Sequence, residues 1–247
     1  MATFMKYKDI FLDFDDTLYD THGNAVIALR ETFLLFRLQR FFPEPQVFYD
    51  AYWWANIKLW TQYSKGEISR DHLILERFRR PLCESEELRA KSEKNPSEFK
   101  DFSLRMSDVF LNLCSAKPGV VEGAQELMAY LQKRDYRIHM TSNGFHEVQY
   151  KKLASCGLKD YFSTIILSED AGANKPSPLY FDYALSASGA DKETTLMIGD
   201  NVQTDIMGAL GAGIDAMLFN RWNVETKDCP LTPTFIVNSL KEIMTIL

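Results

Sequence analysis

Short apolar runs that alternate with helical segments constrain the fold of this chain more than any other feature of its sequence. Beyond residue 118 the mainly apolar runs are 164–167, 195–198, 216–219 and 235–237, and at 137–141 two apolar residues alternate with polar ones as in a strand. The segments between them that have helical character are 120–133, 178–188 and 205–212. Strands that alternate with helices predict a parallel sheet that is covered by helices on both faces.

One further strand is predicted near the start of the chain, at residues 9–14, and a long helical stretch follows it. From about residue 24 to 115 apolar side chains recur at helical spacing, and Ser69 is placed to cap a helix. Trp53, Trp54 and Trp60 share this spacing and are predicted to lie in the core of the stretch. We therefore predict an α/β protein, a Rossmann-like doubly wound parallel sheet with an inserted all-helical domain.

The predicted domain boundaries follow from this pattern. Residues 1–20 and 115–247 form the sheet domain, and residues 21–114 form the inserted helical domain. His139 lies in the middle of a predicted strand, and we expect it in the core.

Composition and charge exclude several classes of protein. The chain has 247 residues with 46% hydrophobic residues, enough for a sizeable core without disulfides, and its net charge of −6 argues against binding a nucleic acid polymer. It has no apolar run of membrane-spanning length and no leader-like apolar segment at its start. The four cysteines lack zinc-site spacing and are expected to be reduced thiols. We expect a cytoplasmic protein, a monomer or weak dimer that does not bind membranes.

Polar side chains follow four of the predicted strands at the point where each strand ends. They are Asp13 and Asp15 after the first strand, Ser142 and Asn143 (followed by Gly144) after the second, Lys175 after the third, and Asp200 with Asp205 after the fourth. Ligands of a doubly wound sheet bind outside the carboxyl ends of its strands. Carboxylates that gather there suit a hard cation such as Mg²⁺, which relieves their mutual repulsion. The sequence therefore predicts a Mg²⁺ site at this edge.

These pieces resemble the haloacid dehalogenase (HAD) superfamily of phosphohydrolases. The motifs are D-x-D-x-T at 13–17, Ser142-Asn143-Gly144, Lys175-Pro176 and G-D-x₄-D at 199–205, and all four occur in order at family-like spacing. The resemblance covers residues 1–20 and 115–247, the HAD core. The helical insertion resembles the type-1 cap, which closes over the pocket and selects the leaving group.

The resemblance implies a role for each motif. Asp13 would be the nucleophile and a metal ligand, giving an aspartyl-phosphate. Asp15 would be the general acid and then the base, and its backbone carbonyl would bind the metal. Lys175 would screen the negative charge of the substrate. Asp200 would be the second carboxylate on the metal.

The remaining motif residues would support these groups. Ser142, with backbone N–H groups near Asn143 and Gly144, would hold the oxygens of the transferring phosphoryl group. Asp205 would act outside the metal's ligands and orient Lys175 or water. Thr17 and Asn201 are predicted to act in the same outer layer, and Asn201 would otherwise cap the following helix.

The resemblance narrows the substrate to a small phosphate ester. An acid at position 15 favours a leaving oxygen that needs a proton. The sequence of residues 144–162 and 167–185, with N-x₃-W-x₂-Y-x₂-G-x-I at 56–68, resembles that of the pyrimidine 5′-nucleotidase branch. A nucleoside 5′-monophosphate is therefore the expected substrate. The alternatives are a phosphoglycolate or sugar-phosphate phosphatase, a phosphomutase, and a non-catalytic binding protein.

Overall fold

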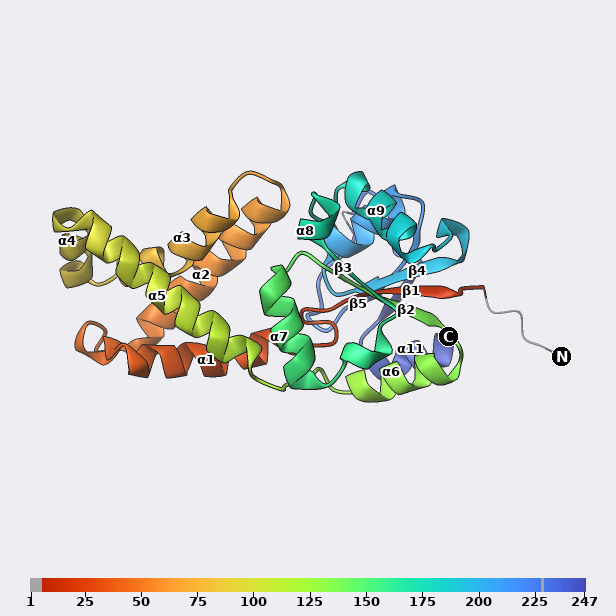
Figure 1. Cartoon of the computed structure of the whole chain (residues 1–247), viewed down its shortest axis with the longest axis horizontal. Coiled ribbons are helices and arrows are strands. Elements are labelled where there is room, and N and C mark those ends of the chain that lie inside the picture. The colour runs from red at the N-terminus through yellow and green to blue at the C-terminus, as the bar shows by residue number, and fades with distance from the viewer. Residues whose placement is uncertain (1–5, 228) are drawn as a thin grey trace. The chain divides into compact units, whose positions relative to one another are not determined.

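A six-stranded sheet forms the centre of the larger of two compact units (Figure 1). The structure is a computed structural model that describes residues 6–227 and 229–247. Its strands are β1 (Asp9–Asp13), β2 (Arg137–Ser142), β3 (Thr164–Leu167), β4 (Thr195–Gly199), β5 (Asp215–Phe219) and β6 (Phe235–Val237). Their order is β3-β2-β1-β4-β5-β6 and every pair is parallel. The predicted fold class is confirmed.

Strand β1 is buried along its whole length because it lies between β2 and β4 and is covered on both faces. Ile10 and Leu12 belong to one core cluster, whereas Phe11 belongs to another. This alternation follows from the two-residue period of a strand, which sends successive side chains to opposite faces. A continuous apolar run is thus what a central parallel strand requires.

Helices form a layer on each face of this sheet. The helices of this unit are α6 (Ala124–Lys133), α7 (His146–Cys156), α8 (Ser168–Ala171), α9 (Pro178–Ser188), α10 (Met207–Gly211) and α11 (Leu240–Ile246). Figure 1 shows α6 beside α11, with α9 on the other side of the sheet. Leu131 of α6 and Ile243 of α11 are in the cluster of Leu12, and Phe181 of α9 is in the cluster of Phe11.

The second compact unit, Gly23–Lys117, is helical and has its own aromatic core. Its helices are α1 (Thr21–Leu35), α2 (Pro45–Ser64), α3 (Arg70–Leu82), α4 (Glu86–Lys94) and α5 (Pro96–Ser115). Phe33, Phe48, Tyr52 and Phe110 are buried together between these helices. Ser69 caps α3, because its Oγ accepts a hydrogen bond from the backbone N–H of His72 (3.2 Å).

The larger unit consists of Met1–His22 and Pro118–Leu247. Residues 1–5, which the predicted segment 1–20 includes, lie outside the described residues. The division into a core domain (1–20 and 115–247) and a cap domain (21–114) stays a prediction.

Two predicted helices and one predicted core residue differ from the structure. The helix predicted from residue 120 begins at Ala124, because Gly123 has a left-handed φ of 87°. The helix predicted at 205–212 is split into a π-helical turn, Val202–Ile206, and α10. Trp54 is 63% exposed, so its predicted core position is wrong, whereas Trp53 packs against the aromatic core.

Two further predictions concern membrane-spanning helices and the state of the cysteines. Within 6–227 and 229–247, every helix is too short or too polar to cross a bilayer. Cys83, Cys114, Cys156 and Cys229 all carry free thiols.

Candidate active site

The acids that the sequence analysis singled out follow the two central strands of the sheet. β1 ends at Asp13, and β4 ends at Gly199, directly before Asp200. From β1 the sheet extends through β2 and β3 on one side and through β4, β5 and β6 on the other. Strand order therefore reverses between β1 and β4, which is where doubly wound sheets bind their ligands.

A buried lysine joins two of these acids. Lys175 Nζ donates to Asp13 Oδ1 (2.7 Å), to Asp205 Oδ1 (2.7 Å) and to the backbone carbonyl of Thr141 (3.3 Å). The three N–H donors of the ammonium are thus all used, and the side chain is only 2% exposed. Thr17 Oγ1 donates to the other oxygen of Asp13, Oδ2 (3.1 Å). The Asp13 carboxylate is therefore fixed in direction from both sides.

The charges at this edge do not balance, and the pKa values reflect it. Burial raises the pKa of Asp13 to about 7, with Asp205 adding to the rise and Lys175 opposing it. Burial also raises the pKa of Asp200 well above its usual range, and Asp13 and Asp205 add to that rise. Burial would lower the pKa of Lys175, but the two carboxylates outweigh it and raise that pKa. Lys175 therefore stays a charged ammonium, and the carboxyl groups around it outnumber it.

This donor set fits a hard divalent cation. Asp13, Asp200 and Asp205 each offer a carboxylate oxygen, and the three oxygens lie within 4.8 Å of one another. A single ammonium cannot neutralise three carboxylates, and oxygen ligands alone match Mg²⁺ rather than zinc. The Asp15 carboxylate is not part of this group. Asp15 was predicted to bind the metal through its backbone carbonyl.

Asp15 points its carboxylate to a different set of partners. Its Oδ1 accepts a hydrogen bond from Thr21 Oγ1 (2.5 Å) and pairs with the Lys152 ammonium, and its Oδ2 accepts from Gln149 Nε2 (2.6 Å). Burial would raise the pKa of Asp15, but the Lys152 charge and these hydrogen bonds outweigh it and lower that pKa. This environment favours the ionised carboxylate, which is the form that accepts a proton.

Gln149 and Lys152 are polar residues on α7 that the sequence analysis missed. Both are buried, and they lie three residues apart on one face of the helix. Gln149 Nε2 also donates to Ser142 Oγ (2.5 Å), and a Cβ at Gly144 would lie 2.1 Å from that nitrogen. Glycine at 144 is what admits the glutamine. The Q-x-x-K spacing just after Ser142-Asn143-Gly144 is the signal that could have revealed them.

Asn143 makes its side-chain contacts with the backbone of Lys175. Its Oδ1 accepts from the Lys175 N–H (2.8 Å), and its Nδ2 donates to the Lys175 carbonyl (2.9 Å). The loop after β2 thereby holds the loop that carries the lysine. Ser142 Oγ accepts from the Gly144 N–H (3.0 Å). The predicted phosphoryl-binding roles of these three residues stay predictions.

The π-helical turn after β4 holds Asp205. Asp205 Oδ2 accepts from the Asn201 N–H (3.1 Å), and a Cβ at Gly199 would lie 2.3 Å from that same oxygen. Asn201 Oδ1 accepts from the N–H groups of Gln203 (3.0 Å) and Thr204 (3.1 Å), which is a capping arrangement. Its side chain thus makes the capping contacts that were the alternative to a role in the layer outside the metal's ligands.

Trp222 is a further residue that the sequence analysis missed. Its Nε1 donates to Asp200 Oδ2 (3.2 Å), and its ring meets the edge of the His22 ring at 5.7 Å between centroids. Trp222 lies between β5 and β6, far in the sequence from any motif.

Asp16, with a left-handed φ of 62°, forms the turn after β1, and its carboxylate accepts a hydrogen bond from the His22 N–H (2.9 Å).

Comparison with known proteins identifies the family. Residues 7–213 match the model of the haloacid dehalogenase-like hydrolases. This chain belongs to that family. It is 31% identical over 244 residues to the pyrimidine 5′-nucleotidase YjjG of Escherichia coli strain K12, covering 97% of each chain. It is 30% identical to the pyrimidine 5′-nucleotidase PynA of Streptococcus pneumoniae, covering 97% of this chain and 94% of PynA.

A solved structure of a family member has the same fold. The HAD-hydrolase YfnB of Bacillus subtilis, whose crystal structure was determined bound to magnesium, superposes with a TM-score of 0.81 at 27% identity. The match covers 98% of this chain and 99% of YfnB. The family and these relatives confirm the predicted enzyme class, a phosphoric monoester hydrolase.

Proposed function

We propose that this enzyme hydrolyses a small phosphate monoester through a phosphorylated Asp13, with a nucleoside 5′-monophosphate as its substrate. The observation that carries the proposal is the position of Asp13. Its carboxylate is buried and is held by Lys175 and Thr17. The carboxylates of Asp200 and Asp205 lie beside it.

Asp13 and Asp200, with the backbone carbonyl of Asp15, would hold the Mg²⁺ ion. A bound Mg²⁺ supplies positive charge that screens the phosphate and stabilises charge in the transition state. Asp205 stays with Lys175, since its side chain is only 1% exposed against 10% for that of Asp13, and it also accepts a hydrogen bond from the Asn201 N–H. That arrangement supports the outer role predicted for Asp205.

In the first step one oxygen of Asp13 forms a bond to phosphorus while the bond from phosphorus to the ester oxygen breaks. The leaving oxygen takes the proton that Asp15 must carry when this step begins, so an alcohol departs, an aspartyl-phosphate remains and Asp15 is left ionised. Lys175 neutralises charge on the carboxylate and the phosphoryl group. Ser142 and the N–H groups near Asn143 and Gly144 bind the phosphoryl oxygens.

In the second step a water molecule attacks the aspartyl-phosphate, and Asp15 takes the proton that this water loses. Inorganic phosphate leaves and the Asp13 carboxylate is restored. The lowered pKa of Asp15 supports this proton-accepting role. Gln149 and Lys152 hold the Asp15 carboxylate in one orientation, which positions it for both proton transfers.

The substrate class rests on two supports. The relatives at 30–31% identity over nearly the full chain are named pyrimidine 5′-nucleotidases. The helical unit carries the N-x₃-W-x₂-Y-x₂-G-x-I pattern of that branch at 56–68. Phosphoglycolate and sugar phosphates are the competing substrates, since the residues that hold phosphate do not read the leaving group.

A panel of phosphate esters tests this proposal. The full chain is assayed with Mg²⁺ for kcat/KM on UMP, dUMP, dTMP, phosphoglycolate and a sugar phosphate, with inorganic phosphate as the measured product. The expected result is the highest kcat/KM for a pyrimidine nucleotide. A higher value for phosphoglycolate or the sugar phosphate would replace the nucleotide as substrate. An isomerised sugar phosphate without free phosphate would mean a phosphomutase.

A further inference from the structure

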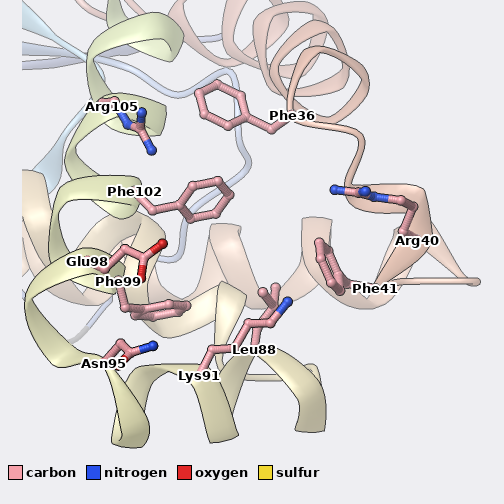
Figure 2. A pocket seen from close by; sticks show the side chains of 10 residues that line it. All are labelled: Phe36, Arg40, Phe41, Leu88, Lys91, Asn95, Glu98, Phe99, Phe102 and Arg105. Atoms are coloured by element: carbon pink, nitrogen blue, oxygen red, sulfur yellow. The ribbon is translucent and has the colours of Figure 1, made fainter.

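The helical unit contains a cavity of about 320 Å³ that has no part in the proposed chemistry. Figure 2 shows it between the end of α1 with the turn that follows, α4, and the first half of α5. This volume is at the lower end of the range for small-molecule sites, which is roughly 300–1,000 Å³. All of its lining residues belong to the unit Gly23–Lys117.

The cavity is distant from both links to the sheet-containing unit. α1 begins at the first link and spans about 22 Å before the cavity. α5 ends at the second link, and its lining residues Asn95 to Arg105 are in its first half or directly before it. The cavity is therefore a separate site from the acids at Asp13 and Asp200, which lie in the other unit.

Phenylalanine rings form the walls of the cavity. Phe36 and Phe102 meet edge to face, with 5.5 Å between ring centroids. Both rings and that of Phe41 are only partly buried, so their remaining surface is available to an occupant. Aromatic rings prefer to stack or meet edge-on with another ring, and each such pair adds about 0.5–1.5 kcal/mol beyond area burial. The walls therefore suit a flat aromatic group.

The rim of the cavity is basic, although the whole chain has a net charge of −6. Arg40, Lys91 and Arg105 line the cavity together with one acid, Glu98. Lys91 pairs with Glu87 (2.7 Å), and both Lys91 and Arg40 lie over the Phe41 ring, at 4.8 Å and 5.3 Å. Within the described residues, neither Arg40 nor Arg105 has a carboxylate partner. The guanidinium groups of Arg105 and Arg40 lie on opposite sides of the cavity (Figure 2), and each remains available to an anion.

We propose that this cavity binds a small planar aromatic anion, with its ring among Phe36, Phe41 and Phe102 and its acidic group at Arg105. Asn95 adds a polar side chain at the edge, and it makes no capping hydrogen bond to α5 that would occupy it. Glu98 of the same helix repels an acidic group, so that group has to lie at Arg105 and away from Glu98. The inference is independent of which ester the enzyme hydrolyses.

Calorimetric titration of the full chain with 2-naphthoate tests the proposal. The matched probe is 2-naphthamide, which has the same shape without the charge. We expect saturable one-to-one binding of the naphthoate and weaker binding of the amide. Inorganic phosphate with Mg²⁺ should not displace the naphthoate, because phosphate binds in the other unit. Displacement by phosphate, equal binding of the two probes, or no saturable binding would overturn the proposal.

Three substitutions sharpen the test. Arg105→Gln should weaken naphthoate binding by about tenfold, the loss of one charge-assisted hydrogen bond. Glu98→Gln should tighten it several-fold by removing a like charge. Arg30→Gln is the matched control, an exposed arginine of the same unit outside the cavity lining, and should change nothing. The naphthamide affinity should be the same in all three proteins. A loss with Arg30→Gln equal to that with Arg105→Gln would mean general charge attraction and would refute the site.

Discussion

Strand β1 carries a buried aspartate at each end, and the two are neutralised in different ways. At the amino end, Asp9 Oδ1 contacts His139 Nε2 (2.9 Å) and its Oδ2 accepts from Arg137 Nη2 (2.7 Å). The Arg137 side chain is half exposed to water. At the carboxyl end, Asp13 shares one buried ammonium, that of Lys175, with Asp205.

The difference separates a structural ion cluster from a reactive one. At the amino end the single carboxylate of Asp9 is paired with one half-exposed cation, Arg137, so no carboxylate charge remains unpaired. At the carboxyl end three carboxylates offer oxygens within 4.8 Å of one another, one lysine pairs with two of them, and Asp13 and Asp205 are buried while Asp200 is half-buried. The pKa values of Asp13 and Asp200 are raised there, which indicates a site that needs added positive charge to keep its carboxylates ionised.

The largest expected effect is that of removing the charge of Asp13. Asp13→Asn should lower kcat on the order of 10⁴-fold or more, because an amide cannot attack phosphorus. Asp9→Asn is the matched change at the other end and should leave kcat close to that of the unmodified enzyme. Release of phosphate from UMP measures both, with circular dichroism to verify folding. Equal losses in the two variants would remove the distinction between the ends.

Metal removal should also act at the carboxyl end alone. EDTA should stop turnover and Mg²⁺ should restore it, since the acids then lose their counter-charge. Mg²⁺ should also raise the melting temperature by about 5 °C, because it binds the folded state. Thermal melts of Asp200→Asn should lack this rise, and those of Asp9→Asn should keep it. Turnover that persists in EDTA would contradict the assignment of a metal site.

Removing the cation at each end should change stability to different degrees. Lys175→Met leaves two buried carboxylates without a partner and should cost about 3–5 kcal/mol in the free energy of unfolding. Arg137→Met removes a half-exposed cation that water partly replaces, and should cost about 1 kcal/mol or less. Urea unfolding in EDTA measures both. If the arginine variant is the less stable one, the amino end is the more strained cluster.

The smallest effect concerns pH at the amino end. Burial lowers the pKa of His139 from its usual value of 6.5, and nearby Arg137 adds to this, although Asp9 opposes it. The unfolded chain then binds the proton more readily, so the contribution of His139 to stability is complete above about pH 6.5 and declines below it. Urea unfolding at pH 7.5 and 5.5 should show a smaller pH difference in His139→Gln. An unchanged difference would contradict a buried neutral histidine.

The sequence predicted the sheet better than it predicted the surroundings of the site. Apolar runs such as 195–198 predicted strands because a central parallel strand, here β4, is buried on both faces. The carboxyl ends of parallel strands lie at the same edge of a sheet, so the sequence also predicted that Asp13, Asp200 and Lys175 lie close together. Gln149 and Trp222 were missed because their partners, Asp15 and Asp200, are distant in the chain. The side-chain contacts of Asn143 with the Lys175 backbone were missed for the same reason.

The sequence by itself determined the order of the elements and the types of residue at the strand ends, because periodicity and chemistry are local properties of a chain. Only the tertiary structure decided which acid pairs with which base. Asp205 lies with Lys175, and Asp15 lies with Lys152, because the π-helical turn after β4 and the face of α7 set those directions. It also decided where cations remain without acids, as at Arg105, because charge balance depends on neighbours in space.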